Sequence, residues 1–211
     1  MVRARTLKIV SENGEHQAVD LGHHGRMTHT EPALTLFVEH VPSPLGTLLL
    51  LTDADDRVRV LEFDDHEFRF ERSLRLHYGR DKTRLVDRPA PSSARFALER
   101  YFAGDLTAID SLEVATAGTP FQRTVWAALR TIPAGETRSY SELADAIGRP
   151  RAVRAVGLAN GSNPIGIVVP CHRVIGADAS LTGYGGGLHR KQWLLEHEGA
   201  LVSRPVGPAS G

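Results

Sequence analysis

Cys171 carries the most nucleophilic side chain in this sequence, and it is the only cysteine among 211 residues. It stands in the run Pro170-Cys171-His172-Arg173-Val174, between an apolar segment and a histidine. The thiolate is the reactive form of cysteine, and because its reference pKa is about 8.5, neighbouring groups must favour it. A purely structural thiol is the competing interpretation of Cys171 taken alone, since free cysteine is among the most buried residue types.

His172 is the nearest base to this thiol. Adjacent residues of an extended chain point to opposite sides, so we expect a bridging water between His172 and Cys171. A histidine in this role needs a carboxylate to orient it, and Glu198 is the acid that the sequence favours, because it ends the last helix of the same unit. The alternative for Glu198 is a solvent-facing acid at a helix end.

The segments around Cys171 are predicted from their apolar spacing. Residues 165–169 are predicted as a short buried strand that ends at Pro170, with helices at 119–132, 139–148, 152–159 and 189–197. Ser139 and Glu142 have the spacing of a capping box. The two short helices with a glycine turn between them predict a helix-turn-helix, although many helical hairpins bind nothing. The glycine-rich loop at 176–187 surrounds Tyr184.

The first half of the chain predicts a small α/β domain. Three β-rich runs at 33–41, 46–52 and 57–63 are separated by turn signals and followed by helices at 65–77 and 92–102. Its acids fall at turns and solvent-facing positions, so we expect no catalytic residue there. The fold class is therefore α+β, with an antiparallel sheet in the first domain and a mainly helical second domain. The predicted boundaries are a loose extension at 1–30, with Met27 as an alternative start, a domain at 31–110, a linker at 108–118, a second domain at 118–200 and a tail at 201–211.

Composition restricts the classes of function. The chain is 41% hydrophobic with a formal net charge of zero, but residues 119–211 carry 10 basic and 6 acidic residues. Between Ala146 and Ala177 there are no acids, and we expect the arginines there to favour a polyanion, against the alternative of an ordinary solvated surface: Arg149, Arg151, Arg154 and Arg173. One cysteine excludes internal disulfides and multi-cysteine zinc sites, so we expect no such metal site and a reducing cytoplasmic location. No membrane span or secretion signal is predicted.

Several motifs of the second half, in their order and spacing, resemble the O6-alkylguanine-DNA alkyltransferase family. The resemblance covers residues 33–200, loosely in the first half and closely from Gly118 onward. Its motifs are RAVG at 154–157, Asn163-Pro164, PCHRVI at 170–175, YGGGL at 184–188 and KQWLLEHEG at 191–199.

This resemblance implies DNA repair by irreversible transfer of an alkyl group from O6 of guanine to Cys171, with no cofactor and no metal, and with O4 of thymine as a second expected substrate. One molecule would serve once, as a monomer, on double-stranded DNA entered from the minor groove with the damaged base flipped out. The implied catalytic residues are Cys171 as acceptor, His172 acting through water, Glu198 holding His172, and Asn163 bracing the turn. The implied DNA contacts are Tyr140, Ser141, Arg149 and Arg154, with Arg154 replacing the flipped base, and the implied base pocket is Val174, Tyr184 and Gly185.

One residue departs from the family pattern, because many relatives have Ser where this chain has Gly185. Any side-chain hydroxyl contact is absent there, and only a backbone donor to O6 remains. Three other classes of function stay open. A protein that binds alkylated DNA without transfer would be expected to lack the nucleophile, a helix-turn-helix regulator would read bases, and a cysteine hydrolase would turn over.

Overall fold

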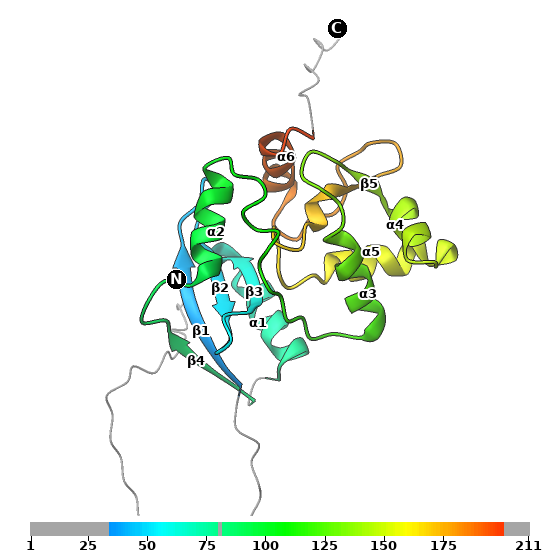
Figure 1. Ribbon diagram of the computed structural model, residues 1–211. Coiled ribbons are helices and arrows are strands. Elements are labelled where there is room, and N and C mark those ends of the chain that lie inside the picture. Colours follow the sequence, from blue (N-terminus) through cyan, green and yellow to red (C-terminus); the bar gives the residue numbers. More distant parts are fainter. Residues whose placement is uncertain (1–33, 80–81, 201–211) are drawn as a thin grey trace, which may run out of the picture.

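The computed structural model describes residues 34–79 and 82–200, in which a sheet with two helices lies beside a helical unit (Figure 1). The α+β class predicted from the sequence is confirmed. The predictions for residues 1–30, for Met27 and for the tail at 201–211 lie outside the described residues. No helix in the described ranges is long and apolar enough to cross a membrane.

The sheet of the first unit has the strand order β3-β2-β1-β4. Strands β1 (Leu34–Val41), β2 (Leu48–Thr52) and β3 (Val58–Phe63) form the predicted antiparallel meander. Strand β4 (Thr83–Asp87) pairs parallel with β1 and was not predicted. It is a short edge strand in which only Val86 is buried, so its sequence lacks the alternation that identifies a strand. The sheet is therefore mixed.

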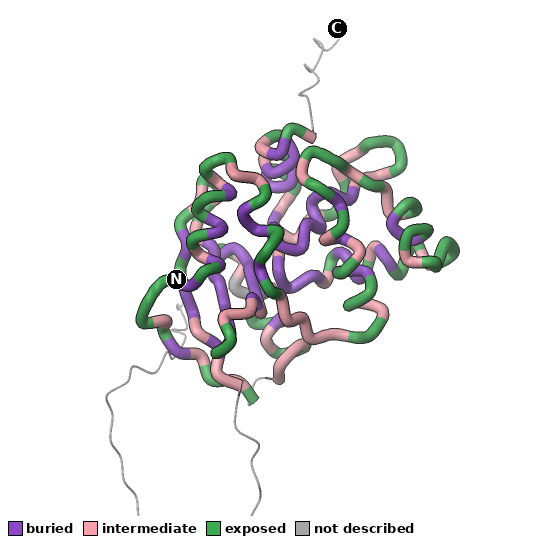
Figure 2. The backbone as a smooth tube through the Cα atoms, in the orientation of Figure 1, coloured by how far each residue is buried: buried purple, intermediate pink, exposed green. Residues whose placement is uncertain are grey.

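Side chains alternate between the two faces of this sheet, as the strand period requires. Leu49 and Leu51 of β2 pack towards Phe70 of α1 (Glu67–His77), which follows a 3-10 turn at Asp64–His66. Leu48 and Leu50 face the opposite way, towards α2 (Ser93–Phe102). This second core continues without a break into the helical unit, as the run of buried backbone in Figure 2 shows.

The helical unit begins with two capped helices. Helix α3 (Pro120–Leu129) is capped by Thr119 and Gln122, and α4 (Tyr140–Ala146) has the predicted capping box of Ser139 and Glu142. After a 3-10 turn at Pro150–Ala152, helix α5 (Val153–Gly161) packs on α3 and α4, so α4 and α5 form the predicted helix-turn-helix pair. The remaining elements are β5 (Arg138–Ser139), a 3-10 turn at Cys171–Arg173, β6 (Val174–Ile175) and α6 (Leu188–His197).

The predicted strand at residues 165–169 is wrong. Ile165 makes one isolated bridge to Leu61 of β3, and the chain then turns sharply, with Ile167 in the left-handed region at φ 69°. The amide of Val169 donates to the carbonyl of Ile165 at 3.0 Å, which closes the turn. These residues lie where the sheet meets the helices, so their apolar character comes from burial without a sheet ladder. Cys171 is therefore presented by a tight turn.

The segment at 108–118, predicted as a linker, is packed against the rest of the molecule. Ile109 and Leu112 belong to the core, and Val114 bridges to Val58 of β3. The amide of Leu61 also donates to the carbonyl of Pro164 at 2.9 Å, which ties the sheet directly to the turn before Cys171. The two units thus meet beside the cysteine.

Candidate active site

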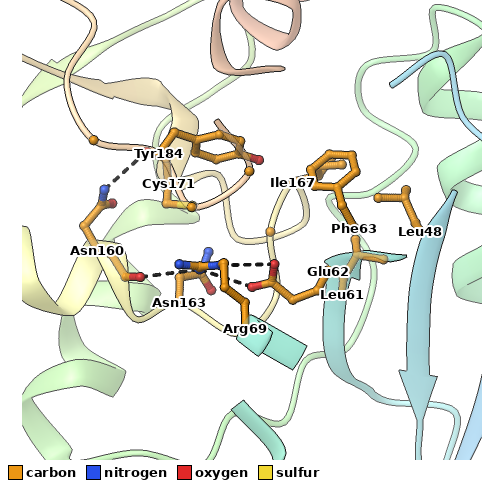
Figure 3. A pocket seen from close by; sticks show the side chains of 15 residues that line it. Leu48, Leu61, Glu62, Phe63, Arg69, Asn160, Asn163, Ile167, Cys171 and Tyr184 are labelled. Atoms are coloured by element: carbon orange, nitrogen blue, oxygen red, sulfur yellow. Dashed lines mark hydrogen bonds and ion pairs between the residues drawn. The ribbon is translucent and has the colours of Figure 1, made fainter. Parts of the chain in front are cut away.

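Cys171 lies at the start of its 3-10 turn beside a small cavity, with 6% of its surface exposed (Figure 3). The cavity has a volume of about 20 Å³, which is room for a single water molecule. Residues from both units line it, including Glu62, Phe63 and Arg69 from the sheet side, and Asn160, Asn163, Tyr184 and Gly185 from the helical side. The thiol therefore faces an enclosed, mixed polar and apolar space.

Asn163 holds the turn that carries Cys171. Its Oδ1 accepts from the amide of Ile165 at 3.0 Å, and its Nδ2 donates to the carbonyl of Val169 at 2.8 Å. The amide group thus closes both ends of the turn while it is almost wholly buried. Asn163 also lowers the pKa of the Cys171 thiol, which favours the thiolate. Asn163 is placed to brace the nucleophile as well as the backbone.

The charge state of Cys171 in this closed site differs from the expectation of an activated thiolate. Burial raises the pKa of the Cys171 thiol above its ordinary value, and nearby Glu62 raises it further, whereas Asn163, Arg69 and Lys191 lower it. Burial is the largest of these effects, because a charged sulfur loses its hydration in an enclosed space. The resting site therefore holds a neutral thiol.

His172 and Glu198 make the direct contact that the sequence suggested. His172 Nε2 lies 2.9 Å from Glu198 Oε1, and both side chains are fully buried. Arg173 adds a two-point ion pair to the same carboxylate, with Nε donating to Oε2 and Nη2 to Oε1, each at 2.8 Å. Tyr101 of α2 donates its hydroxyl to Oε1 at 2.7 Å. Glu198 is therefore the centre of a buried network, and the solvent-facing alternative for it is wrong.

The network determines which nitrogen of His172 carries a proton. Hydrogen bonds from His172 and Arg173 hold the pKa of Glu198 well below its usual range, so Glu198 is a carboxylate. Burial lowers the pKa of His172, which is therefore neutral. A carboxylate only accepts hydrogen bonds, so Nε2 of His172 must be the protonated nitrogen. Nδ1 is then a buried acceptor, and it has no hydrogen-bond partner in the described part of the chain.

The prediction that Arg173 belongs to a basic surface is wrong. It was counted among the arginines of a basic surface, but only 3% of it is exposed, and Nη1 also donates to the carbonyl of Ile132 at 2.5 Å. A buried guanidinium needs a paired carboxylate, and Glu198 supplies it. Arg173 therefore belongs to the network around His172 and not to a DNA-facing surface.

The first unit also lines the cavity, and the expectation that its acids lie at turns and solvent-facing positions is wrong for Glu62. Glu62 of β3 is 7% exposed and pairs with Arg69 of α1, whose Nη2 lies 3.2 Å from Oε1. The guanidinium also reaches the carbonyl of Gly161 at the end of α5, at 3.5 Å. Figure 3 shows this pair across the cavity from Cys171. Sequence patterns do not identify this pair, because an acid in a strand and an arginine in a helix are usually surface residues.

Gly185 lies directly against this arginine. A Cβ atom built at Gly185 would stand 2.2 Å from Cζ of Arg69, so a side chain at residue 185 would displace the guanidinium from its present position. The absence of a side chain at residue 185 and the closed position of Arg69 are therefore linked.

The other predicted base-pocket residues occupy different places. Tyr184 lines the cavity, and its ring stands edge-on to that of His172 with 6.4 Å between the centroids. Val174 is buried and does not line the cavity; its carbonyl accepts from Lys191 Nζ at 2.5 Å. Lys191 also donates to the carbonyl of Thr182 at 2.7 Å, and burial lowers its pKa to about 8. Lys191 thus fastens the glycine-rich loop to β6, a role that the sequence did not reveal.

The predicted DNA contacts lie together on the helix-turn-helix. Ser141 of α4, Arg149 before the 3-10 turn and Arg154 in the first turn of α5 are all exposed. Tyr140 is partly buried, against Gly157 of α5. Among residues 34–79 and 82–200 no group of three histidine, cysteine or acidic side chains is arranged to hold a metal ion.

A buried thiol beside a helix-turn-helix defines a class of protein suited to covalent chemistry on DNA. The family profile described as "6-O-methylguanine DNA methyltransferase, DNA binding domain" matches residues 120–200. The methylated-DNA–protein-cysteine methyltransferase of Salmonella typhimurium is 51% identical over 169 residues, covering 80% of this chain and 99% of that protein. The protein of the same name from Mycobacterium tuberculosis is 59% identical over 128 residues, covering 60% of this chain and 77% of that protein.

Solved structures of similar proteins are also DNA methyltransferases of this kind. The crystal structure of Mycobacterium tuberculosis OGT in complex with DNA aligns with a TM-score of 0.65 and 46% sequence identity, covering 79% of this chain and 94% of that chain. The O6-methylguanine-DNA methyltransferase of the archaeon Pyrococcus kodakaraensis aligns with a TM-score of 0.55 and 26% identity, covering 78% of this chain and 99% of that chain. This chain belongs to the methylated-DNA–protein-cysteine methyltransferase family.

Proposed function

We propose that this protein repairs DNA by direct transfer of an alkyl group from O6 of guanine to Sγ of Cys171. The carbon–sulfur bond forms as the carbon–oxygen bond breaks, and the electron pair of the broken bond stays on the base. The thiol gives up its proton and the guanine takes up one, so the reaction needs no cofactor. The product is a thioether that the protein cannot cleave, and each molecule therefore acts once.

The observation that carries this proposal is the position of Cys171 in an enclosed cavity next to the helix-turn-helix. A base inside a duplex cannot reach a buried thiol, so the damaged nucleotide must be flipped out, at a cost of a few kcal/mol. Arg154 is exposed at the start of α5, where it can take the place of the flipped base. Ser141 and Arg149 lie on the same helix pair and would bind phosphates, while Tyr140 crowds the phosphate beside the flipped nucleotide.

The proton of Cys171 would pass through a water to Nδ1 of His172. This nitrogen is the free acceptor of a neutral imidazole, because Nε2 is committed to Glu198. Glu198 and Arg173 keep the ring in that orientation and tautomer. Since the resting thiol is neutral, we propose that it loses its proton as the alkylated base enters, and that the backbone amide of Gly185 donates to O6 as that oxygen gains charge.

We infer that O4-alkylthymine is a second substrate, that the protein acts as a monomer on the minor groove, and that it works in the cytoplasm, where it associates with the nucleoid when bound to DNA. We also propose a division into a first domain at 31–110 and a catalytic, DNA-binding domain at 118–200.

Intact-mass spectrometry tests the proposal after the protein is mixed with a duplex containing O6-methylguanine. We expect a gain of one methyl group per molecule, located on Cys171 by peptide mapping, and no gain in the control Cys171→Ser. Repaired DNA with an unshifted protein mass would contradict the acceptor role. Repair of many lesions by one molecule would point to a hydrolase, and binding without transfer would point to a damage-binding protein.

A further inference from the structure

The hydroxyl of Tyr101 donates a hydrogen bond to Glu198, and the proposed reaction assigns no role to this contact. Tyr101 lies in α2, 97 residues before Glu198 in sequence, and its ring is fully buried in the core. Its hydroxyl donates to Glu198 Oε1 at 2.7 Å, the same oxygen that faces Nε2 of His172. Tyr101 reaches this network from the first unit, whereas His172 and Arg173 both belong to the turn of Cys171.

The direction of this hydrogen bond is fixed by charge. Burial raises the pKa of Tyr101 far above its ordinary value, with the neighbouring carboxylate of Glu198 as the next cause, so the phenol keeps its proton. Glu198 is a carboxylate and cannot donate. Tyr101 is therefore a permanent donor to Oε1.

A permanent donor on this oxygen affects His172 in two ways. It fixes the carboxylate relative to the core, so that Oε1 stays in line with Nε2. It also withdraws negative charge from Oε1, which makes Glu198 a weaker partner for an imidazolium and keeps the resting His172 neutral. The ionisable groups that face this network are Arg173, Lys191, Tyr184 and, against the ring of Tyr101, His197.

We propose that Tyr101 is a positioning residue for alkyl transfer, which acts through Glu198 to hold His172 neutral with its proton on Nε2. It touches neither Cys171 nor the DNA. This inference rests on the proposed function, and it assigns the first unit a part in the reaction beyond closing the core.

The test compares Tyr101→Phe with the wild-type protein. Phenylalanine keeps the buried ring and removes only the hydroxyl, so we expect the variant to fold. Without the donor, Oε1 pairs more strongly with His172, and the imidazole takes up a proton at higher pH. We therefore expect the acid limb of the pH–rate profile with free O6-benzylguanine to move upward by up to about one pH unit, which is up to about a tenfold loss of rate at a pH on that limb and little loss on the plateau above it.

The matched control is Tyr78→Phe. Tyr78 also donates its hydroxyl inside the first unit, to the carbonyls of Arg59 and Ala115 at 3.0 and 3.3 Å, away from the network. We expect its pH–rate profile to match that of the wild type. A shift of the acid limb in both variants would overturn the proposal, because it would show a general effect of losing a buried hydroxyl.

Nitrogen-15 NMR of histidine-labelled protein supplies a second readout that a loss of packing would not change. The wild type should show His172 as the neutral tautomer with its proton on Nε2, and Tyr101→Phe should show a greater share of imidazolium at the same pH. A wild-type His172 protonated on Nδ1 would overturn the proposal even if the variant failed to fold. If the wild type transfers a methyl group while Tyr101→Phe keeps its rate, profile and tautomer, only this inference is lost; if the wild type transfers none, the proposed function fails.

Discussion

At the scale of single residues, the site depends on which protonation states the buried network permits. His172 is kept neutral by burial, and Glu198 is kept ionised by His172 and Arg173. Both pKa values are lowered on folding, so the unfolded chain binds protons at these groups before the folded protein does. Acid must therefore destabilise the fold through both residues.

The free energy of unfolding, measured by urea denaturation across pH, tests this linkage. The contribution of His172 should be complete above its ordinary pKa of 6.5 and be lost as pH falls towards its lowered value in the folded protein. That of Glu198 should be lost below its ordinary pKa of 4.5. Each group adds a slope of at most about 1.4 kcal/mol per pH unit.

The variant His172→Gln should flatten the profile between about pH 4.5 and 6.5, after allowance for its lower stability overall. His189→Gln, which changes an exposed histidine of α6, serves as the control and should keep the wild-type slope. An equal slope in His172→Gln and the wild type would mean that other groups carry the acid sensitivity.

The sequence identified the reactive and titratable side chains of the site. It did not identify the residues that hydrogen-bond or form ion pairs with them. Cys171, His172 and Glu198 were named because a lone thiol, an adjacent imidazole and a nearby acid suggest a nucleophile and its base. Arg173 stands beside them in sequence and was interpreted as a surface charge, since a basic residue near other arginines gives no sign that it is buried. Only the fold shows that its carboxylate partner, Glu198, is 25 residues away.

At the scale of elements, the helix-turn-helix is the part that could be predicted best. Its capping box and the glycine turn before Arg149 are local signals, and α4 and α5 lie where those signals place them. The turn at 165–169 could not be predicted in the same way, because its hydrogen bonds run to the side chain of Asn163 and to Leu61 of another unit. Strand β4 was missed for a similar reason. Its sequence lacks the apolar alternation of a strand, and its backbone hydrogen bonds to the distant strand β1 hold it extended.

The exposed side chain of Arg154 on helix α5 can be tested by substitution. Replacing Arg154 with alanine removes an exposed side chain from the first turn of α5 and leaves the cavity of Cys171 unchanged. We expect Arg154→Ala to slow repair of an O6-methylguanine duplex by at least about tenfold, because flipping costs a few kcal/mol, while the rate with free O6-benzylguanine stays near that of the wild type. Stopped-flow rates with both substrates measure the difference.

Arg151→Ala is the comparison variant, since Arg151 is exposed on the same segment and its loss removes only a charge near the phosphates. Its effect on duplex repair should be smaller and should vanish at high salt. If Arg154→Ala lowered the reaction rates with the duplex and with free O6-benzylguanine equally, Arg154 would stabilise the cavity and not the flipped-out nucleotide.

At the scale of the whole molecule, the site is assembled between two units that are distant in sequence. Glu62, Arg69 and Tyr101 come from the first unit, and none of them was predicted, because their partners lie about 90 to 100 residues further along the chain or on a different element. The cavity beside Cys171 is far smaller than a guanine base, whereas a groove of about 710 Å³ adjoins it and shares Glu62, Arg69, Gly161 and Asn163 with it. The side chain of Arg69 lines both spaces.

Shortening this side chain should therefore open the cavity to its substrate. We expect Arg69→Ala to raise the rate with free O6-benzylguanine by about threefold to tenfold, which corresponds to roughly 0.7–1.4 kcal/mol of barrier. Arg75→Ala, which removes an exposed arginine of α1 that lines neither the cavity nor the groove, should leave the rate unchanged. A slower reaction in a folded Arg69→Ala protein, with its melting temperature checked separately, would contradict a blocking position and favour a direct role in holding the base.

The small volume beside Cys171 also affects the protein after it has reacted. A methyl group left on sulfur would take the place of the single water that about 20 Å³ can hold, and a buried water that bridges polar groups is costly to remove. The spent molecule would then be less stable than the unused one, by an amount large enough to change its abundance in a cell, where unfolded chains are removed by proteases. A tightly closed site would thus give the protein a built-in lifetime that ends soon after its single reaction.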